Sequence, residues 1–90
     1  TVVDRNWRCS DGEIDLVLAR GRTVVFCEVK TRTSDRYGSP FDAVGPDKQR
    51  RVRRLAGRWL REAAPFRPDD VRFDVAGVMS RRVDVIEGAF

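Results

Sequence analysis

The chain has 90 residues, of which 18 are Lys or Arg and 14 are Asp or Glu, so its formal net charge is +4 at pH 7. Its 41% hydrophobic content is too high for a disordered segment, and its length leaves room for one domain, which we take to span residues 1–90. The chain contains no His, which excludes a Ser-His or Cys-His nucleophile pair and a His-bearing zinc site within it.

The cysteines and the hydropathy pattern bear on the cellular compartment. Cys9 and Cys27 are too few for a disulfide scaffold and lie far apart in the sequence, so we expect buried free thiols in a reducing cytoplasm. No long uncharged run is present, and neither a signal peptide nor a membrane span is predicted. The expectation is a cytoplasmic protein without a membrane partner.

Three strands are predicted in the first third of the chain, at about residues 2–8, 13–19 and 23–31. The Asp-Gly pair at residues 11–12 is a strong turn signal between the first two strands. Gly21 can supply the positive φ of a tight hairpin turn between the second and the third. The third strand is almost continuously apolar from residue 24 to residue 29, which is typical of a strand covered on both faces.

A helix and two further strands are predicted in the rest of the chain. Residues 33–45 lack periodicity and predict a long loop, and Pro46 favours the start of a helix that runs to about residue 64. Apolar residues recur there at helical spacing, which places them, Trp59 included, in the core: Val52, Leu55, Ala56, Trp59, Leu60 and Ala63. Strands follow at residues 71–78 and, more weakly, 83–86.

The order of these elements predicts the fold class. The first three strands, joined by hairpins, form an antiparallel meander. The helix then crosses over, and the fourth strand lies parallel to the third. The predicted fold is therefore α/β, with one mixed β-sheet.

Two carboxylates and an amine stand out on the second and third strands. If Gly21 and Arg22 form the hairpin loop, Asp15 lies directly opposite Glu28; if Arg20 and Gly21 form it, Glu28 is a diagonal neighbour. Both registers place the two carboxylates on one face, because strand side chains alternate with a period of two. Lys30, two residues after Glu28, shares that face.

Two interpretations of this group are open. Paired carboxylates suit a hydrated Mg²⁺ ion that activates water for phosphodiester hydrolysis, and a neighbouring ammonium can stabilise the developing charge. Alternatively, the charges belong to a solvated sheet face, and Glu28 and Lys30 form an ordinary surface ion pair. A charged pair that interrupts a strand buried on both faces is costly, which favours a functional role.

The residues around these positions make a family resemblance specific. Residues 12–17 (GEIDLV) and 25–32 (VFCEVKTR) resemble the YraN-like family of small bacterial proteins, and residues 5–8, 47–51 and 87–90 extend the resemblance over nearly the whole chain. That family is similar to archaeal Holliday-junction resolvases and is placed in the restriction-endonuclease-like PD-(D/E)XK superfamily. The resemblance implies a restriction-endonuclease-like mixed sheet.

The resemblance also implies roles for particular residues. Asp15 and Glu28 would bind Mg²⁺ or Mn²⁺, and Lys30 would be the catalytic lysine. Supporting roles would fall to Glu13, Lys48 and Gln49. Family members usually carry another Glu on an N-terminal helix, and we expect that this helix is missing here. A homodimer is a further expectation from resolvases of similar fold.

A basic segment dominates the middle of the chain. Seven cations and no acid lie from residue 48 to residue 61, whereas the rest carries 11 basic and 14 acidic residues, a net charge of −3. A polyanion would relieve the repulsion between these cations and release counterions. The predicted nucleic-acid-binding residues are Arg32, Lys48, Arg50, Arg51, Arg54 and Arg58. A solvated face and an acidic protein partner are the alternatives for this segment.

Together these features predict a nuclease-like protein. The expected activity is Mg²⁺-dependent phosphodiester hydrolysis on structured or branched DNA, with DNA favoured over RNA as the partner. The alternative is a nucleic-acid-binding module that keeps the same fold without turnover.

Overall fold

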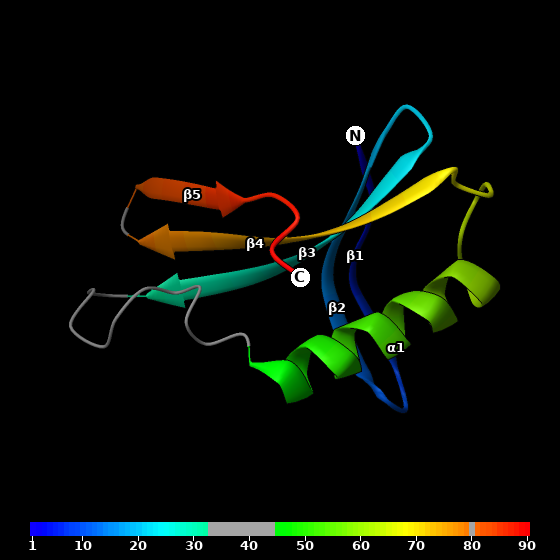
Figure 1. Ribbon diagram of the computed structural model, residues 1–90, viewed down its shortest axis with the longest axis horizontal. Helices are drawn as coiled ribbons and strands as arrows, with labels where there is room; N and C mark the ends of the chain where they lie inside the picture. Colours follow the sequence, from blue (N-terminus) through cyan, green and yellow to red (C-terminus); the bar gives the residue numbers. More distant parts are fainter. Residues whose placement is uncertain (33–44, 80) are drawn as a thin grey trace.

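The structure is a computed structural model that describes residues 1–32, 45–79 and 81–90 (Figure 1). Its elements are, in chain order, β1 (Val2–Cys9), β2 (Gly12–Arg20), β3 (Thr23–Arg32), α1 (Pro46–Glu62), β4 (Asp70–Met79) and β5 (Arg82–Ile86). All predicted strands and the predicted helix are confirmed, with bounds that agree to within two residues. Most of the loop predicted for residues 33–45 lies outside the described residues.

The five strands form one sheet in the order β1-β2-β3-β4-β5. The pairs β1–β2, β2–β3 and β4–β5 are antiparallel, whereas β3 and β4 are parallel. The predicted meander, crossover helix and parallel fourth strand are therefore confirmed. This α/β arrangement is consistent with the restriction-endonuclease-like fold.

The hairpin between β2 and β3 adopts the first of the two predicted registers. Arg20 pairs with Thr23 and Leu16 pairs with Cys27, so Gly21 and Arg22 form the two-residue loop. Gly21 has a φ of 60°, in the left-handed region that Gly adopts at low cost. Continued by one more residue, this register sets Asp15 opposite Glu28.

The core lies between α1 and the sheet. The helix buries Val52, Leu55, Ala56 and Trp59, which confirms the predicted stripe. They pack on a cluster from β2 and β3: Ile14, Val17, Val24 and Phe26. Trp59 is fully buried and meets Phe26 edge to face, with ring centroids 5.6 Å apart. Truncation of a core Trp of this kind to Ala typically costs about 3–5 kcal/mol, so this contact anchors the helix on the sheet.

The third strand is buried on both faces, as its continuous apolar run predicts. Val24, Val25, Phe26 and Cys27 are all buried, although their side chains alternate between the two faces. Glu28 directly follows this run. None of the described helices is long and apolar enough to cross a membrane.

Candidate functional site

The two predicted acids lie at the junction of β2 and β3, near enough for the charge of Glu28 to act on Asp15. Asp15 Oδ2 accepts a hydrogen bond from the backbone N–H of Val29 at 2.9 Å. The pairing of β2 with β3 ends at Leu16 and Cys27. The Asp15 carboxylate therefore accepts its hydrogen bond just beyond the last paired residues of the two strands. This bond holds the Asp15 carboxylate beside Glu28.

Glu28 is the centre of an ion-pair cluster. Its side chain is buried, with the residue only 8% exposed, and its Oε1 lies 2.6 Å from Lys48 Nζ and 3.5 Å from Lys30 Nζ. A buried carboxylate is stable only when such partners compensate its charge. The structure therefore brings Asp15, Glu28, Lys30 and Lys48 together from β2, β3 and the first turn of α1.

Helical spacing explains why Lys48 reaches the sheet. It lies four, seven and eleven residues before Val52, Leu55 and Trp59, on the side of α1 that faces the core. In the sequence Lys48 is one cation of a basic run, and only the family resemblance singles it out. Its position in the buried stripe is the signal that could have identified it from the sequence.

Burial and neighbouring charges shift the pKa values of this cluster. The pKa of Asp15 is raised, chiefly by burial and further by the charges of Glu28 and Glu13, against the Val29 hydrogen bond. The pKa of Lys30 is lowered by its hydrogen bond with Lys48, by burial and by the Lys48 charge. Burial also acts to lower the pKa of Lys48, but hydrogen bonds with Glu28 and Lys30 outweigh it and raise that pKa. Of the two ammonium groups, Lys48 thus holds its proton more tightly.

The donor set fits a hydrated hard cation. Asp15 and Glu28 offer neighbouring carboxylate oxygens, the ligand type that Mg²⁺ and Mn²⁺ prefer. Among the described residues, no group of three or more His, Cys, Asp and Glu could hold a metal ion. Two protein carboxylates suit Mg²⁺, which keeps several of its waters. Zinc sites normally include Cys or His ligands, and the cluster offers neither.

The other two predicted supporting residues lie at the margin of the cluster. Glu13 forms an ion pair with Arg8 across the β1–β2 hairpin, and it reaches Asp15 only through its charge. Gln49 lies next to Lys48 in the first turn of α1, where its backbone N–H donates to Gly45 O at 3.0 Å. Their supporting roles stay predictions.

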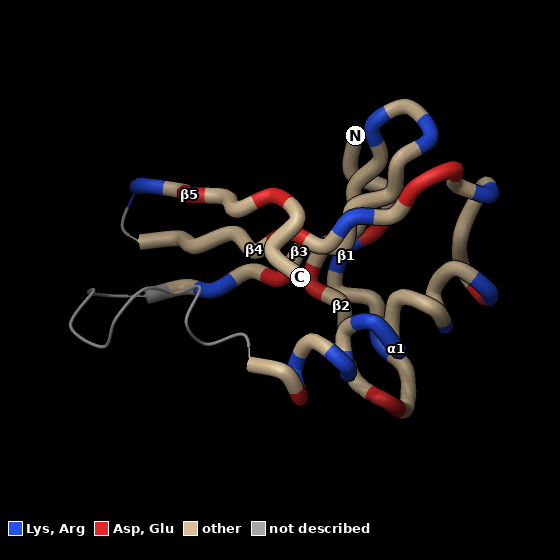
Figure 2. The backbone as a smooth tube through the Cα atoms, viewed as in Figure 1, with Lys and Arg blue, Asp and Glu red and all other residues tan. Residues whose placement is uncertain are grey.

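Figure 2 shows Lys and Arg along α1. Arg50, Arg51, Arg54 and Arg61 are exposed; positions 50, 54 and 61 lie on the side of the helix opposite the buried stripe, whereas positions 51 and 58 lie on its flank. Lys48 differs from these residues because it points into the cluster. The exposed arginines line the solvent side of the same helix whose first turn contributes to the site.

Ion pairs partly relieve the repulsion between the cations of the basic helix. Arg58 Nε pairs with Glu62 Oε2 at 2.6 Å, an i,i+4 pair, and its Nη1 contacts Ser10 Oγ at 3.0 Å and Asp11 Oδ2 at 3.2 Å. Asp47 pairs with Arg50. Acids flanking the basic run supply these partners, and a turn distant in sequence adds another. Arg58 therefore fastens the β1–β2 turn to α1.

The sixth predicted nucleic-acid contact, Arg32, is the last residue of β3. Its backbone lies opposite Met79 of β4, and its side chain is outside the described part of the structure. The position follows Lys30 by two residues on the same strand. Its predicted role in binding is neither supported nor contradicted.

Sequence reasoning missed an ion pair on β4 that joins a buried carboxylate to a partly exposed guanidinium. Asp74 of this strand is only 3% exposed. Arg72 donates two hydrogen bonds of 2.9 Å to its carboxylate, and Gly88 N–H donates a third of 3.0 Å. The Arg-X-Asp spacing, which puts both side chains on one face, was the available signal. The pair ties the segment after β5 to the sheet.

The cysteine prediction is only partly right. Both thiols are free, but Cys27 is buried whereas Cys9 is half-buried. Burial, with the charges of Asp74, Asp15 and Glu28, raises the pKa of Cys27 to about 11. Its thiol is therefore protonated and unreactive at neutral pH.

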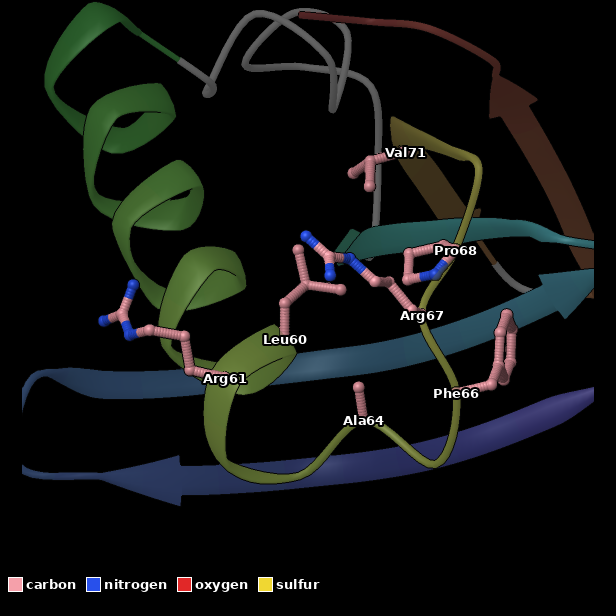
Figure 3. Close-up of a pocket in the computed structure, with 7 residues that line it drawn as sticks. All are labelled: Leu60, Arg61, Ala64, Phe66, Arg67, Pro68 and Val71. Carbon is pink, nitrogen blue, oxygen red and sulfur yellow. The ribbon is translucent and has the colours of Figure 1, made fainter.

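Two hollows mark the surface of the described residues. A groove of 480 Å³ borders the cluster and is lined by Val2, Arg5, Asn6, Asp15, Leu16 and Val29. A hollow of 660 Å³ lies at the C-terminal end of α1, lined by Leu60, Arg61, Ala64, Phe66, Arg67, Pro68 and Val71 (Figure 3). Val71 pairs with Val24 at the start of β3, whereas Glu28 and Lys30 lie near its end. The larger hollow is thus separate from the cluster.

Known proteins resemble this chain along nearly all of its length. The profile of the uncharacterised protein family UPF0102 matches residues 1–78. A UPF0102 protein of Frankia alni is 53% identical over 99% of this chain and 78% of its own length. One from Mycolicibacterium vanbaalenii is 54% identical over 96% of this chain and 70% of its own length. One from Streptomyces griseus is 51% identical over 90% of this chain and 68% of its own length.

Proposed function

The chain belongs to the uncharacterised protein family UPF0102, the YraN-like family of restriction-endonuclease-like fold, and we propose that it is a metal-dependent nuclease. The reaction is hydrolysis of a phosphodiester bond, and the substrate is structured or branched DNA. The observation that carries the proposal is the convergence of Asp15, Glu28, Lys30 and Lys48 at one end of the β2–β3 pair. The names of the relatives describe no activity, so the proposal rests on the chemistry of these four side chains.

Each side chain has a defined part in the proposed reaction. Asp15 and Glu28 would hold Mg²⁺ or Mn²⁺, which supplies an activated water and neutralises charge on the phosphate. Lys30 would donate a hydrogen bond to the phosphate or hold the attacking water, and its lowered pKa eases proton exchange there. Lys48 compensates Glu28, and its ammonium would move toward the phosphate once the carboxylate binds a cation.

The exposed arginines of α1 support DNA as the partner. Arg50, Arg51, Arg54 and Arg61 can neutralise backbone phosphates without reading bases, which suits recognition by shape. We also propose that the protein is cytoplasmic. The two free thiols support this location, because the cytoplasm keeps cysteines reduced. A preference for branched substrates is the part of the proposal that derives from the family resemblance.

A divalent-metal cleavage assay on linear and branched DNA tests the proposal. Cleavage in Mg²⁺ or Mn²⁺ should fall by at least about 100-fold in Asp15→Asn, which weakens the metal site, and in Lys30→Ala, which removes the ammonium at the phosphate. Arg20→Gln is the matched control, since Arg20 is an exposed cation at the far end of β2, outside both the cluster and the arginines of α1. Cleavage that survives both cluster substitutions contradicts the assignment.

A non-catalytic nucleic-acid-binding module is the second candidate. The observation that favours it is the Glu28 carboxylate, which already has two ammonium partners and so offers less charge to a metal. This candidate predicts salt-sensitive DNA binding with no metal-dependent cleavage. The same assay separates the two, because binding without cleavage in any divalent metal would identify the module.

We propose a second copy of the chain as a protein partner along β5. This outer strand is exposed along its length, with Val83 60% and Val85 53% exposed. Antiparallel pairing of two β5 strands centred on Val83 would set Arg82 of each copy opposite Asp84 of the other. Opposite charges at directly facing positions stabilise such a pair, and the exposed valines would be covered.

A further inference from the structure

The side chains of the β1–β2 hairpin switch from one face of the sheet to the other at the level of Asp15. On β2, Ile14 and Val17 both belong to the helix-side core, although residues three apart on a regular strand lie on opposite faces. On β1, Trp7 packs against the same core, and Asp4 Oδ2 accepts a hydrogen bond from Trp59 Nε1 at 2.9 Å. On each strand, the regular alternation of side chains between the two faces is therefore interrupted between these residues. We call this interruption the turnover of the hairpin.

The turnover occurs at the same level on both strands. Trp7 pairs with Ile14, and Arg5 pairs with Leu16. Between these pairs Asn6 lies opposite Asp15. Asn6 has a φ of 51°, the one left-handed residue other than Gly among the described residues. Asn tolerates this region better than most residues, but it is rare inside a strand.

The consequence for Asp15 is a change of direction. Its carboxylate reaches along the sheet to Val29 N–H on β3, rather than standing above the strand as regular alternation would place it. Irregularities of this kind occur next to active sites, where they redirect a side chain. Asn6 is also exposed and lines the 480 Å³ groove together with Asp15.

We propose that Asn6 is a positioning residue whose left-handed backbone conformation aims the Asp15 carboxylate at Val29 and at the metal position. Its contribution is the backbone conformation and not its amide group. This inference rests on the proposed function for its metal readout, but the geometry of Asp15 can be tested without a metal.

Three variants separate backbone conformation from chemistry. Asn6→Gly keeps the left-handed conformation and removes the amide, whereas Asn6→Val disfavours that conformation. Gly21→Val is the matched control, because Gly21 has a φ of 60° and nothing lies within 4 Å of its added Cβ. It applies a similar backbone penalty at the other end of β2, so it reproduces the loss of stability away from Asp15.

The first readout is amide hydrogen exchange at Val29, which reports the hydrogen bond to Asp15. Asn6→Val should speed this exchange by at least about 10-fold relative to Gly21→Val, and Asn6→Gly should match the wild type. The second is Mg²⁺ affinity by calorimetry, with a loss of about 10-fold or more in Asn6→Val alone. The third is cleavage, with kcat/KM lower by about 100-fold in Asn6→Val.

Two results would overturn the inference. Equal Val29 exchange in Asn6→Val and Gly21→Val means that Asn6 affects only stability. An Asn6→Gly variant as impaired as Asn6→Val means that the amide and not the backbone conformation is required. Failure of the proposed function has a different signature: a wild-type protein without Mg²⁺ binding or cleavage, in which Val29 exchange still responds to Asn6→Val as predicted.

Discussion

Asp15 carries a carboxylate whose partial burial works against its own ionisation. Burial raises its pKa, and the neighbouring Glu28 and Glu13 raise it further, while the Val29 hydrogen bond opposes them. A pKa that is higher in the folded than in the unfolded chain means that the protonated form favours folding. That contribution is present at acidic pH and is lost as the pH rises through the folded pKa, so ionised Asp15 destabilises the fold at neutral pH.

Asp15→Asn should therefore stabilise the protein while it abolishes cleavage. Asn can still accept the Val29 hydrogen bond but carries no charge. At pH 7 we expect a gain of about 0.5 kcal/mol or less in the free energy of unfolding, since solvent screening reduces the effect. Urea unfolding of both proteins across pH measures it. The gain should shrink toward acidic pH, and a gain that grows on acidification contradicts the pKa direction.

At the scale of single residues, the sequence singled out Asp15, Glu28 and Lys30 as candidates but did not show which ion pairs they form. Period-two alternation was enough to set Glu28 and Lys30 on one face of β3, whereas the direction of the Asp15 carboxylate depends on the interruption of alternation at Asn6. The 2.6 Å contact of Lys48 with Glu28 depends on where α1 docks, which no local pattern specifies. The left-handed Asn6 likewise has no turn signal in its neighbourhood, because the surrounding residues read as a regular strand.

The helix α1 has two sides with different tasks. Its buried stripe anchors it to the sheet and carries Lys48 to the site. The opposite side presents arginines, but they are not equivalent. Arg54 is exposed, whereas Arg58 contacts Glu62 and Asp11. The periodicity predicted the two sides, but it could not show that Arg58 contacts a turn far away in the sequence.

Neutralising Arg54 and Arg58 should produce different defects. Arg54→Gln should weaken DNA binding and reduce the dependence of log K on log salt by about 0.9, the release from one phosphate contact. Arg58→Gln should lower the melting temperature and leave the salt slope nearly unchanged. Fluorescence anisotropy at several salt concentrations and thermal unfolding measure the two. Equal changes of slope in both variants would show that Arg58 also contacts phosphate.

Charge and shape are unevenly distributed over the whole molecule. The net charge of +4 combines seven cations on the α1 segment with a net −3 elsewhere, so an approaching polyanion meets the helix side first. At the edge of the sheet, β5 exposes Val83 and Val85 between charged residues. The surfaces proposed for nucleic acid and for a second copy are thus different, so the two partners would not compete.

The proposed β5 pairing predicts a dimer that one charge disrupts. Val83→Arg places two like charges on the symmetry axis and should weaken self-association by about 10-fold or more. Val2→Arg is the matched control, because Val2 is 45% exposed on β1, the strand at the other edge of the sheet. Sedimentation at several protein concentrations measures both. Wild-type protein that is monomeric throughout, or a loss confined to Val2→Arg, contradicts this pairing.

The sequence by itself determined the elements, their order and the mixed topology of the sheet. These follow from local causes: alternation in strands, the helical stripe with its initial Pro46, and turn residues such as Gly21. It also determined that Glu28 and Lys30 share one face of β3. The resemblance of residues 12–17 and 25–32 to the YraN-like family, confirmed by the family match, depended on contiguous residues as well.

Only the tertiary structure decided which charges meet. Lys48 rather than Lys30 is nearest to Glu28, Arg58 contacts the β1–β2 turn, and the buried Asp74 pairs with the partly exposed Arg72. The turnover of the hairpin at Asn6 is likewise a feature that only the tertiary structure shows. Coulomb and hydrogen-bond energies depend on distances of a few ångströms between separate elements, and helix docking sets those distances. Hydrophobic periodicity specifies which side of an element is buried, but not which neighbour lies against it.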